Sequence, residues 1–565
     1  MKVNPKNNLR RVKKVTGFLK KRLILMILAL VFLLSVTGIG LAQQLGAPDL
    51  PEEQKQVKNI IMMIPDGMGV SHVTLTRWYK GGELLAMDQI ACGLVRTHAS
   101  DSAITDSAPA ATVMATGHKS HTGFIGTLPD VANMPGLDPI KPGEERRPVA
   151  TILEAAKLKG LATGLVATSQ IPHATPAGFS AHYPNRNEYE LLIEQQVYNN
   201  IDVVLGGGYE YLEKRKDKEN LVAVLRKRGY DYITTRDELS KIKGSKVWGM
   251  FAPVDLAYDF DRPIHEPTLA EMTKCALEIL SKDPDGFFLM VEGSKIDWAA
   301  HANDPVGIVS DVIAFDHAVK TALDFAFQDG NTAVIVAADH FTGGMSIGNL
   351  DKNYDIQHIS AFLDPLTKAK VTGEGLEKKL NSDRTNIVEV MEEFFGIEDL
   401  TEEEIQAIAA AKAGTINEVV GPIISRRALL GWTSHGHTGN DVVLYMYHPK
   451  GYRYYGVIDN ADINKYMQEV LDIDLTETTK RLFVRAYDAY TVKGASLAVD
   501  SKDPENPVLV ITKGKTQIKL PVNKNIALVG GKEIHLTGVV VYTGEFNEFD
   551  INKWYVSQEA IDLIE

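Results

Sequence analysis

Cysteine is scarce in this chain of 565 residues, which contains only Cys92 and Cys275. So few cysteines exclude a disulfide-rich scaffold and a zinc site built from thiolates. In an exporting cell the two could pair, but two unrelated buried thiols are the simpler interpretation. The sequence contains no internal repeat either.

Acidic residues are missing from residues 1–22, which carry nine Lys or Arg, and residues 23–42 contain no charge at all. A basic segment, an apolar segment and the small residues Gly40 and Ala42 are typical of a secretory signal, with cleavage expected after Ala42. The apolar segment is also long enough to span a bilayer, so membrane anchoring by residues 23–42, with the basic flank in the cytoplasm, is the alternative. Both interpretations predict an exported protein that is extracellular, attached to the cell surface or periplasmic.

Basic residues are in the minority in the rest of the chain, where acidic residues outnumber them. Removing the nine basic residues of the leader takes the formal net charge from −13 to −22. Such an acidic protein is a poor partner for nucleic acid or for an anionic membrane. An anionic substrate would therefore need a locally positive site.

The chain beyond the leader divides into three parts by composition. Residues 43–57 form a polar linker. In residues 58–475, continuous apolar segments alternate with helical patterns, which predicts an α/β fold: a doubly wound, mostly parallel sheet with helices on both faces. Within this α/β domain, residues 346 to about 430 read as a mainly helical insertion. Residues 476–565 alternate β-branched residues with turn residues and predict a small β-rich accessory domain. We expect buried strands at residues 60–64, 164–169, 202–208, 286–294 and 332–340.

The G-x-S-x-G motif of many serine hydrolases is also missing, although one serine stands out. In "TDSAPAATVMATGHKSHTG", Pro109 and the small apolar residues after it predict a helix with Ser107 in its first turn and Gly117 at its end. A serine at a helix N-terminus lies beside free backbone N–H groups, where an anion can bind. The simpler alternative is that Asp106 or Ser107 only caps the helix. A reactive serine also needs a base, a lowered pKa or a metal.

Carboxylates and histidines follow the expected strands, where the carboxyl ends of a parallel sheet form a crevice. Asp297 and His301 are four residues apart and share a face if their segment is helical, which suits zinc. Taken singly, each such residue has an ordinary role as a cap, a surface pair or a core histidine. Together they favour two divalent ions that hold both oxygens of a phosphoryl displacement and ionise Ser107. The set comprises Asp66, Glu292, Asp297, His301, Asp339, His340, His435 and His437.

Six motifs in order resemble the alkaline phosphatase family. They are "IPDGMG", "TDSAPAATVMATGHKSHTG", "HATPAGFSAHYPNR", "VEGSKIDWAAH", "ADH" and "SHGHTG", which lie between residue 59 and about residue 475. The resemblance implies the alkaline phosphatase fold and a hydrolase of small phosphate monoesters with a broad substrate range. It also implies a phosphoserine intermediate, two Zn²⁺ ions and one Mg²⁺ ion.

The resemblance assigns roles to residues of this chain. Ser107 would be the nucleophile, Arg186 would bind two phosphate oxygens with its planar guanidinium, and Asp106 would orient Arg186. The implied metal ligands are Asp297, His301 and His437 for one zinc, Asp66, Asp339, His340 and Ser107 itself for the other, and Asp66, Thr175 and Glu292 for magnesium.

Two positions depart from part of the family. His173 stands where some members have Asp, and Trp298 stands where some have Lys. The pair resembles other members that combine His with Trp, and it leaves the occupancy and ligands of the third metal site open. We give His435 no metal role, and we interpret His118, His121 and His182 as structural or solvated.

Two other functions compete with this hypothesis. One is a phosphodiesterase or sulfatase of the same superfamily. "DSAPAAT" lacks the arginine of a sulfatase motif, and a diesterase would have little use for Arg186. The other is a noncatalytic surface protein that binds phosphate or metal, which the presence of Ser107 with every expected ligand disfavours. The sequence leaves open the physiological substrate and whether the protein is a homodimer.

Overall fold

The computed structural model describes residues 50–349 and 357–564. The leader expected at residues 1–42 and residues 43–49 of the expected linker lie outside this part. Within the described residues, no helix has the length and apolar character needed to cross a membrane.

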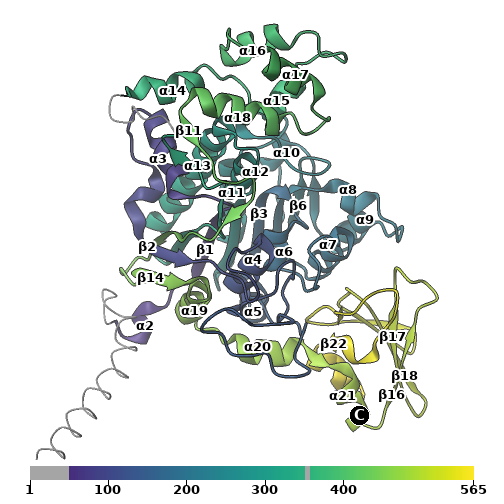
Figure 1. The fold of residues 1–565 in the computed structure, drawn as a ribbon. Coiled ribbons are helices and arrows are strands. Elements are labelled where there is room, and N and C mark those ends of the chain that lie inside the picture. Colours follow the sequence, from purple (N-terminus) through teal and green to yellow (C-terminus); the bar gives the residue numbers. More distant parts are fainter. Residues whose placement is uncertain (1–49, 350–356, 565) are drawn as a thin grey trace, which may run out of the picture. The chain divides into compact units, whose positions relative to one another are not determined.

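A ten-stranded sheet forms the centre of the fold (Figure 1). Its central and right-hand strands are parallel, whereas β13 runs antiparallel to both β8 and β2. The α/β fold with a mostly parallel sheet is therefore confirmed, and each of the five expected strands is present. In sheet order the strands are β14 (Gly456–Asp459), β2 (Ala91–Arg96), β13 (Val442–Tyr447), β8 (Thr332–Ala337), β1 (Asn59–Pro65), β7 (Phe287–Gly293), β3 (Ala162–Gln170), β4 (Val203–Gly207), β6 (Val247–Met250) and β5 (Asp231–Ile233).

Helices cover both faces of this sheet because its central strands are apolar on both sides. Every residue of β1, β3, β7 and β8 is buried. One helical layer contains α3 (Val70–Tyr79), α11 (Leu269–Leu280) and α13 (Pro305–Asp329), which pack on one another. The other contains α4 (Ser107–Thr116), α5 (Ile152–Leu158), α6 (Ala174–Gly178) and α19 (Asn460–Leu471). Continuous apolar strands thus become the buried layer between two sets of helices.

The mainly helical insertion lies between β10 (Ser346–Ile347) and β11 (Leu430–Gly431). Its helices are α14 (Ile359–Thr367), α15 (Gly373–Glu377), α16 (Ile387–Phe395), α17 (Glu402–Ala410) and α18 (Asn417–Arg427). The remaining elements before the C-terminal region are α2 (Glu52–Lys55), α7 (Tyr189–Tyr198), α8 (Tyr209–Glu213), α9 (Leu221–Lys227), α10 (Arg236–Leu239), α12 (Lys295–His301), β9 (Phe341–Thr342), β12 (His437–Thr438) and the 3₁₀ turns η1 (Ala86–Ile90) and η2 (Asp259–Asp261).

We call residues 484–564 the C-terminal module; α20 (Leu475–Leu482) precedes it. Its antiparallel sheets enclose an apolar core that includes Tyr490, Leu509 and Trp554, so the expected β-rich character is confirmed. One sheet contains β16 (Ser496–Asp500), β17 (Val508–Lys513), β18 (Thr516–Pro521), β19 (Ile526–Val529) and β20 (Lys532–His535). The other contains β15 (Val484–Arg485), β22 (Trp554–Val556) and β21 (Val541–Tyr542), and the module also has α21 (Ala486–Val492), η4 (Ile551–Lys553) and α22 (Gln558–Asp562).

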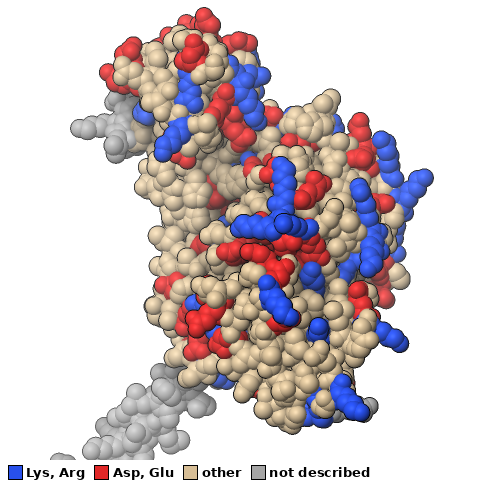
Figure 2. All heavy atoms as spheres, turned by 90° about the vertical axis from the view of Figure 1, so that its right-hand side faces the viewer, with Lys and Arg blue, Asp and Glu red and all other residues tan. Residues whose placement is uncertain are grey.

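Charges of both signs are mixed on the surface. On the face that Figure 2 shows, Lys and Arg side chains lie among Asp and Glu side chains, and no broad area is basic alone. This face therefore offers no continuous positive surface of the kind that holds a nucleic acid backbone. The two cysteines are separate thiols, with Cys92 half-buried and Cys275 buried.

Candidate active site

Ser107 is the first residue of α4, whose ten residues are all buried. The helix ends where Gly117 adopts a left-handed conformation with φ of 78°, as the sequence predicts. The Asp106 carboxylate does not cap this helix. It accepts a hydrogen bond from the Gly123 backbone N–H at 3.0 Å and pairs with Arg186. The capping alternative for Asp106 is therefore wrong, and its carboxylate is free to hold the guanidinium.

Three neighbouring strands bring the expected carboxylates together. Strand β1 lies between β7 and β8 in the sheet, so Asp66 at the end of β1 lies beside Glu292 of β7 and Asp339 after β8. All three side chains are fully buried. The strand-end argument made from the sequence thus describes the real crevice.

Position 67, directly after Asp66, needs a glycine because other side chains crowd this edge of the sheet. Its φ is +69°, and a Cβ there would lie 2.7 Å from both Asp297 Oδ1 and Thr342 Oγ1. Its backbone N–H also donates to Asp339 Oδ1 at 3.1 Å. A larger residue would push apart the side chains that the strands bring together.

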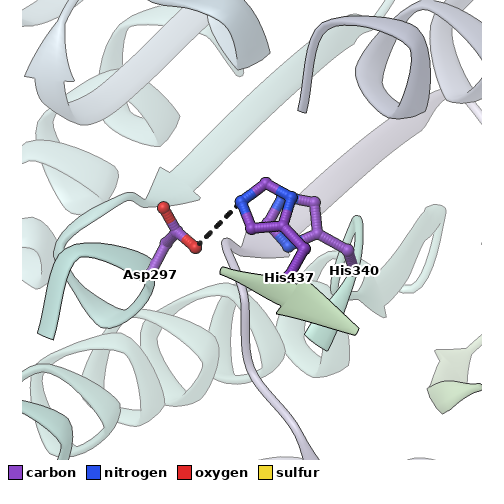
Figure 3. A group of neighbouring side chains, drawn as sticks. All are labelled: Asp297, His340 and His437. Carbon is purple, nitrogen blue, oxygen red and sulfur yellow. Dashed lines mark ion pairs between the residues drawn. The ribbon is translucent and has the colours of Figure 1, made fainter. Parts of the chain in front are cut away.

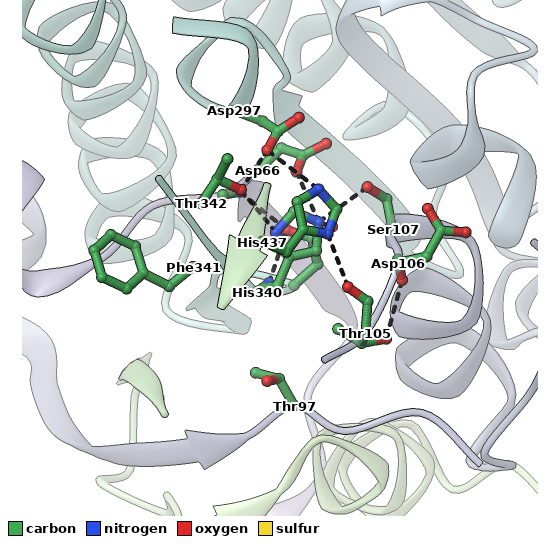
Figure 4. Close-up of polar contacts among 12 residues, drawn as sticks. Asp66, Thr97, Thr105, Asp106, Ser107, Asp297, His340, Phe341, Thr342 and His437 are labelled. Carbon is green, nitrogen blue, oxygen red and sulfur yellow. Dashed lines mark hydrogen bonds and ion pairs between the residues drawn. The ribbon is translucent and has the colours of Figure 1, made fainter. Parts of the chain in front are cut away.

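One group of ligand atoms surrounds His340. Its Nε2 lies 3.5 Å from Asp66 Oδ1 and 3.1 Å from Asp339 Oδ2. These three residues form a group that could hold a metal ion. Ser107 Oγ lies 3.0 Å from the same His340 Nε2, so the serine hydroxyl points into this group (Figure 4). Burial lowers the pKa of His340, which keeps the imidazole neutral and able to bind a metal.

A second group forms around Asp297 in α12. Asp297 Oδ2 lies 3.2 Å from His301 Nε2, and Asp297 Oδ1 lies 3.7 Å from His437 Nε2 (Figure 3). The two histidine Nε2 atoms are 3.2 Å apart. The His340 ring stacks on His437 with centroids 3.6 Å apart, so His340 also joins Asp297 and His437 in a possible metal group. Burial opposes ionisation of Asp297, but the surrounding imidazoles hold its pKa well below the ordinary value.

A third group shares Asp66 with the first and adds His173 and Glu292. The Thr175 hydroxyl, two residues after His173, is buried without a hydrogen-bond partner among the described residues. Burial, and then Arg186, lowers the pKa of His173 to about 3, so its imidazole is neutral. Its Nε2 lies 3.0 Å from Arg186 Nη2 and can accept a hydrogen bond from it.

The unpaired oxygens of these groups fit metal ions. Both oxygens of Asp66, one of Glu292 and one of Asp339 are buried without a hydrogen-bond partner in the described part of the chain. Burial raises the pKa of Glu292 to about 7 and that of Asp339 to about 6, and it raises that of Asp66 well above the ordinary value. Buried carboxylates are costly unless they are paired or bind a cation. Mixed carboxylate and imidazole donors suit zinc, and carboxylate and hydroxyl oxygens suit magnesium.

Two nearby residues carry no signal in the sequence. The Thr342 hydroxyl donates a hydrogen bond to Asp297 Oδ1 and lies 3.1 Å from His340 Nδ1, so it links the two histidine-containing groups. Lys295 is 1% exposed, and its ammonium lies 4.2 Å from the centre of the Trp298 ring. A threonine and a lysine are too common for pattern alone to single them out.

His435 and His182 lie outside the three groups. The His435 ring bonds to the His301 carbonyl through Nδ1 at 2.9 Å. His182 is fully buried and paired with Glu154, its Nε2 lying 2.9 Å from Glu154 Oε1. These placements agree with the structural interpretation given to them from the sequence.

A buried serine beside carboxylate and imidazole groups, at the carboxyl ends of parallel strands, defines a metal-dependent hydrolase of the α/β class. A family model described as alkaline phosphatase matches residues 57–473. The chain therefore belongs to the alkaline phosphatase family, whose members are metal-dependent phosphatases, and it is an enzyme of that kind.

Relatives from distant organisms agree with this assignment. "Alkaline phosphatase 3" of Bacillus subtilis is 37% identical over 81% of this chain and 98% of its own length. "Repressible alkaline phosphatase" of Saccharomyces cerevisiae is 33% identical over 75% of this chain and 82% of its own length. Among solved structures, the alkaline phosphatase of Thermus thermophilus superposes with a TM-score of 0.67 at 26% identity, over 75% of this chain and 94% of that chain.

Proposed function

We propose that this phosphatase hydrolyses phosphate monoesters through a phosphoserine at Ser107 and releases inorganic phosphate. The observation that carries the proposal is the position of Ser107 Oγ, 3.0 Å from His340 Nε2 inside a group of metal ligands. In the described structure the hydrogen-bond partner of this hydroxyl is His340 Nε2, which is itself a candidate metal ligand and would not be a free base with a metal bound. The serine therefore depends on the metal group for its reactivity.

The proposed metal ligands follow from the three groups. Asp297, His301 and His437 would hold one zinc, Asp66, Asp339 and His340 the other, and Asp66, Thr175 and Glu292 a magnesium, with His173 and Trp298 beside it. When bound, such ions supply Lewis-acid stabilisation and lower the pKa of the oxygens they contact. Because His173 replaces a carboxylate in this group, we expect weaker magnesium binding and competition from zinc.

Arg186 and the start of α4 would bind the phosphoryl group. The guanidinium can donate two parallel hydrogen bonds to nonbridging oxygens, while Asp106 and His173 hold it from the other side. The Ser107 oxygen then forms a bond to phosphorus as the bond from phosphorus to the leaving oxygen breaks. Water later cleaves the phosphoserine and restores the hydroxyl.

Monoesters suit this arrangement better than diesters. A monoester presents two free oxygens to Arg186 beside the attacked phosphorus, whereas a diester has one of its oxygens esterified. We infer a broad range of small monoester substrates, since the recognition proposed here is directed at the phosphate. The leader sequence supports an exported protein.

Substitution of the nucleophile tests this proposal. Ser107→Ala should abolish phosphoenzyme formation, while a low residual rate survives because Arg186 and the metal groups still stabilise the transition state. The enzyme is quenched with acid during turnover of a chromogenic monoester, and the phosphorylated residue is mapped by mass spectrometry. Thr105→Ala is the control, since its hydroxyl lies nearby but bonds to the Asp106 carbonyl. Phosphate found on any residue other than Ser107 would contradict the mechanism.

A further inference from the structure

The C-terminal module begins after the family match ends at residue 473, yet it contacts the segments that carry the site. Phe546 of the module packs against an apolar cluster of the catalytic part. That cluster contains Ala108, which follows Ser107, Ala174, which follows His173, and Tyr183, three residues before Arg186. Phe546 therefore packs on a cluster whose members come from three functional segments.

Tyr183 is held by the module and by the segment at residues 123–125, which also bonds to the backbone of Arg186. The Tyr183 backbone exchanges two hydrogen bonds with Ile125, both 2.9 Å long, and the Arg186 N–H donates to the Gly123 carbonyl, two residues before Ile125, at 2.8 Å. Its hydroxyl donates to the Gly544 carbonyl at 3.2 Å, and its ring lies edge-on to Phe546. The module therefore contacts Tyr183, whose backbone hydrogen bonds fix the position of the chain shortly before Arg186.

Asn523 reaches the same segment by a second route. It lies in the turn between β18 and β19 with φ of +61°, and its side chain is 2% exposed. Its amide accepts from Gln195 Nε2 and donates to Glu194 Oε2, both at 3.1 Å. Gln195 in turn accepts from the His182 N–H at 2.8 Å and donates to the His182 carbonyl at 3.1 Å. Asn523 therefore fixes the amide that holds His182, four residues before Arg186.

From these contacts we propose that the C-terminal module is part of the phosphate-binding scaffold, with Asn523 and Phe546 acting as positioning residues for Arg186. This inference rests on the proposed role of Arg186 in binding phosphate. The two contacts converge on His182 and Tyr183 from different loops of the module, about twenty residues apart in sequence. Because bidentate binding depends on the angle of the guanidinium, a small shift of this segment weakens the contact with phosphate.

The test measures phosphate affinity in full-length variants. Asn523→Gly removes the amide and keeps the positive φ, and Phe546→Leu shortens the side chain that packs on the cluster. We expect each to raise the inhibition constant of inorganic phosphate and the KM of a monoester by roughly three- to tenfold. We expect kcat to change by less than about twofold and zinc content to stay unchanged, because neither residue touches the metal groups.

A matched control distinguishes positioning from general destabilisation. Asn525 is also 2% exposed at the same interface, but it bonds to Arg228 and the Leu536 carbonyl, away from the Arg186 segment. Asn525→Ala should lower the melting temperature without changing the phosphate inhibition constant. If Asn523→Gly and Phe546→Leu match this control while Arg186→Ala loses phosphate affinity, the positioning role is wrong. If Arg186→Ala itself keeps its phosphate affinity, the proposed role of Arg186 is wrong and the inference falls with it.

Discussion

At the scale of single residues, Trp298 illustrates how the structure changes the meaning of a substitution. The resemblance to the family implies that tryptophan here removes a positive charge that some members carry as lysine. The structure places another ammonium, that of Lys295, against the same ring and pairs it with Asp255 and Glu374. The Trp298 ring also lies edge-to-face with the His173 ring, with ring centres 5.8 Å apart. The Lys295 ammonium therefore supplies a positive charge beside the Trp298 ring, and two carboxylates largely neutralise it.

Arg186 is the residue whose proposed role separates substrate classes most sharply. Arg186→Ala should cost about 1.5–3 kcal/mol in transition-state stabilisation on monoesters, the worth of charge-assisted hydrogen bonds, and clearly less on diesters. Comparison of kcat/KM for a matched monoester and diester measures this difference. Arg186→Lys is the control, since it keeps the charge but loses the planar pair of donors. Equal losses on both substrates would contradict bidentate binding.

At the scale of elements, the active site depends on where strands and helices end. Strand β1 ends at Pro65, and the chain turns through Asp66 and Gly67; β8 ends before Asp339 and His340. Helix α12 then projects Asp297 and His301 from one face into the same crevice. These ligands therefore lie within one or two residues of a strand end or on the short helix α12. At these places the sheet fixes the position of the backbone.

Helix α13 offers a test of one such end. Its N-cap, Asp304, is fully buried and accepts a hydrogen bond from the Val306 N–H at 2.9 Å. Burial raises the pKa of Asp304 from 3.8 to about 6. The folded chain therefore holds this proton more tightly than the unfolded chain, and stability falls as the pH rises from about 4 to about 6.

Asp304→Asn keeps the capping oxygen and removes the ionisable group. We expect the variant to be more stable than the native protein by about 1–2 kcal/mol at pH 8, because the neutral amide avoids the cost of ionising a buried carboxyl. The helix N-terminus stabilises the anion and so limits this gain. Asp304→Ala is the control: it also lacks the ionisable group, and it should be about 1 kcal/mol less stable than Asp304→Asn at both pH values because it lacks the cap. Denaturant unfolding at pH 5 and pH 8 measures both. An Asn variant no more stable than the native protein at pH 8 would contradict this account.

At the scale of the whole molecule, the fold buries a cluster of carboxylates for its function. Without metal ions, Glu292 and Asp339 resist ionisation, with pKa values near 7 and 6. When folding raises the pKa of an acid, the stability of the fold falls as the pH rises from the ordinary pKa of that acid to its pKa in the folded protein. Bound cations reverse this, because they bind the ionised oxygens and bind more tightly as the ligands lose protons.

Metal removal should therefore destabilise the protein more at alkaline pH. We expect the difference in melting temperature between metal-loaded and chelator-treated protein to grow between pH 5 and pH 8, and to exceed about 5 °C at pH 8. Glu292→Gln is the matched variant, since it removes one of the buried acids, and its metal-free form should lose less stability with pH. Thermal unfolding at several pH values, with zinc and magnesium or with chelator, provides the measurement. A difference that shrinks toward pH 8 would refute this explanation.

Local patterns were sufficient for much of the fold and for the composition of the candidate site. Apolar segments such as β1 and β7 are continuous in sequence, so their burial on both faces can be predicted without knowledge of their neighbours. Asp66, Glu292 and Asp339 could be grouped because parallel strands present their carboxyl ends at one edge. The left-handed end of α4 at Gly117 likewise depends on a single residue type.

What the sequence alone determined is therefore the class of fold, the helix that begins at Ser107 and the set of residues near the strand ends. The tertiary structure decided between the two roles expected for Asp106, capping α4 or holding Arg186, and it alone placed Lys295 against Trp298 and Thr342 between two ligand groups. It alone brought Asn523 to Gln195, 328 residues away in the chain. The physical reason is that strand and helix patterns depend on neighbours a few residues apart, whereas these contacts depend on how separate elements pack, which no short stretch of sequence encodes.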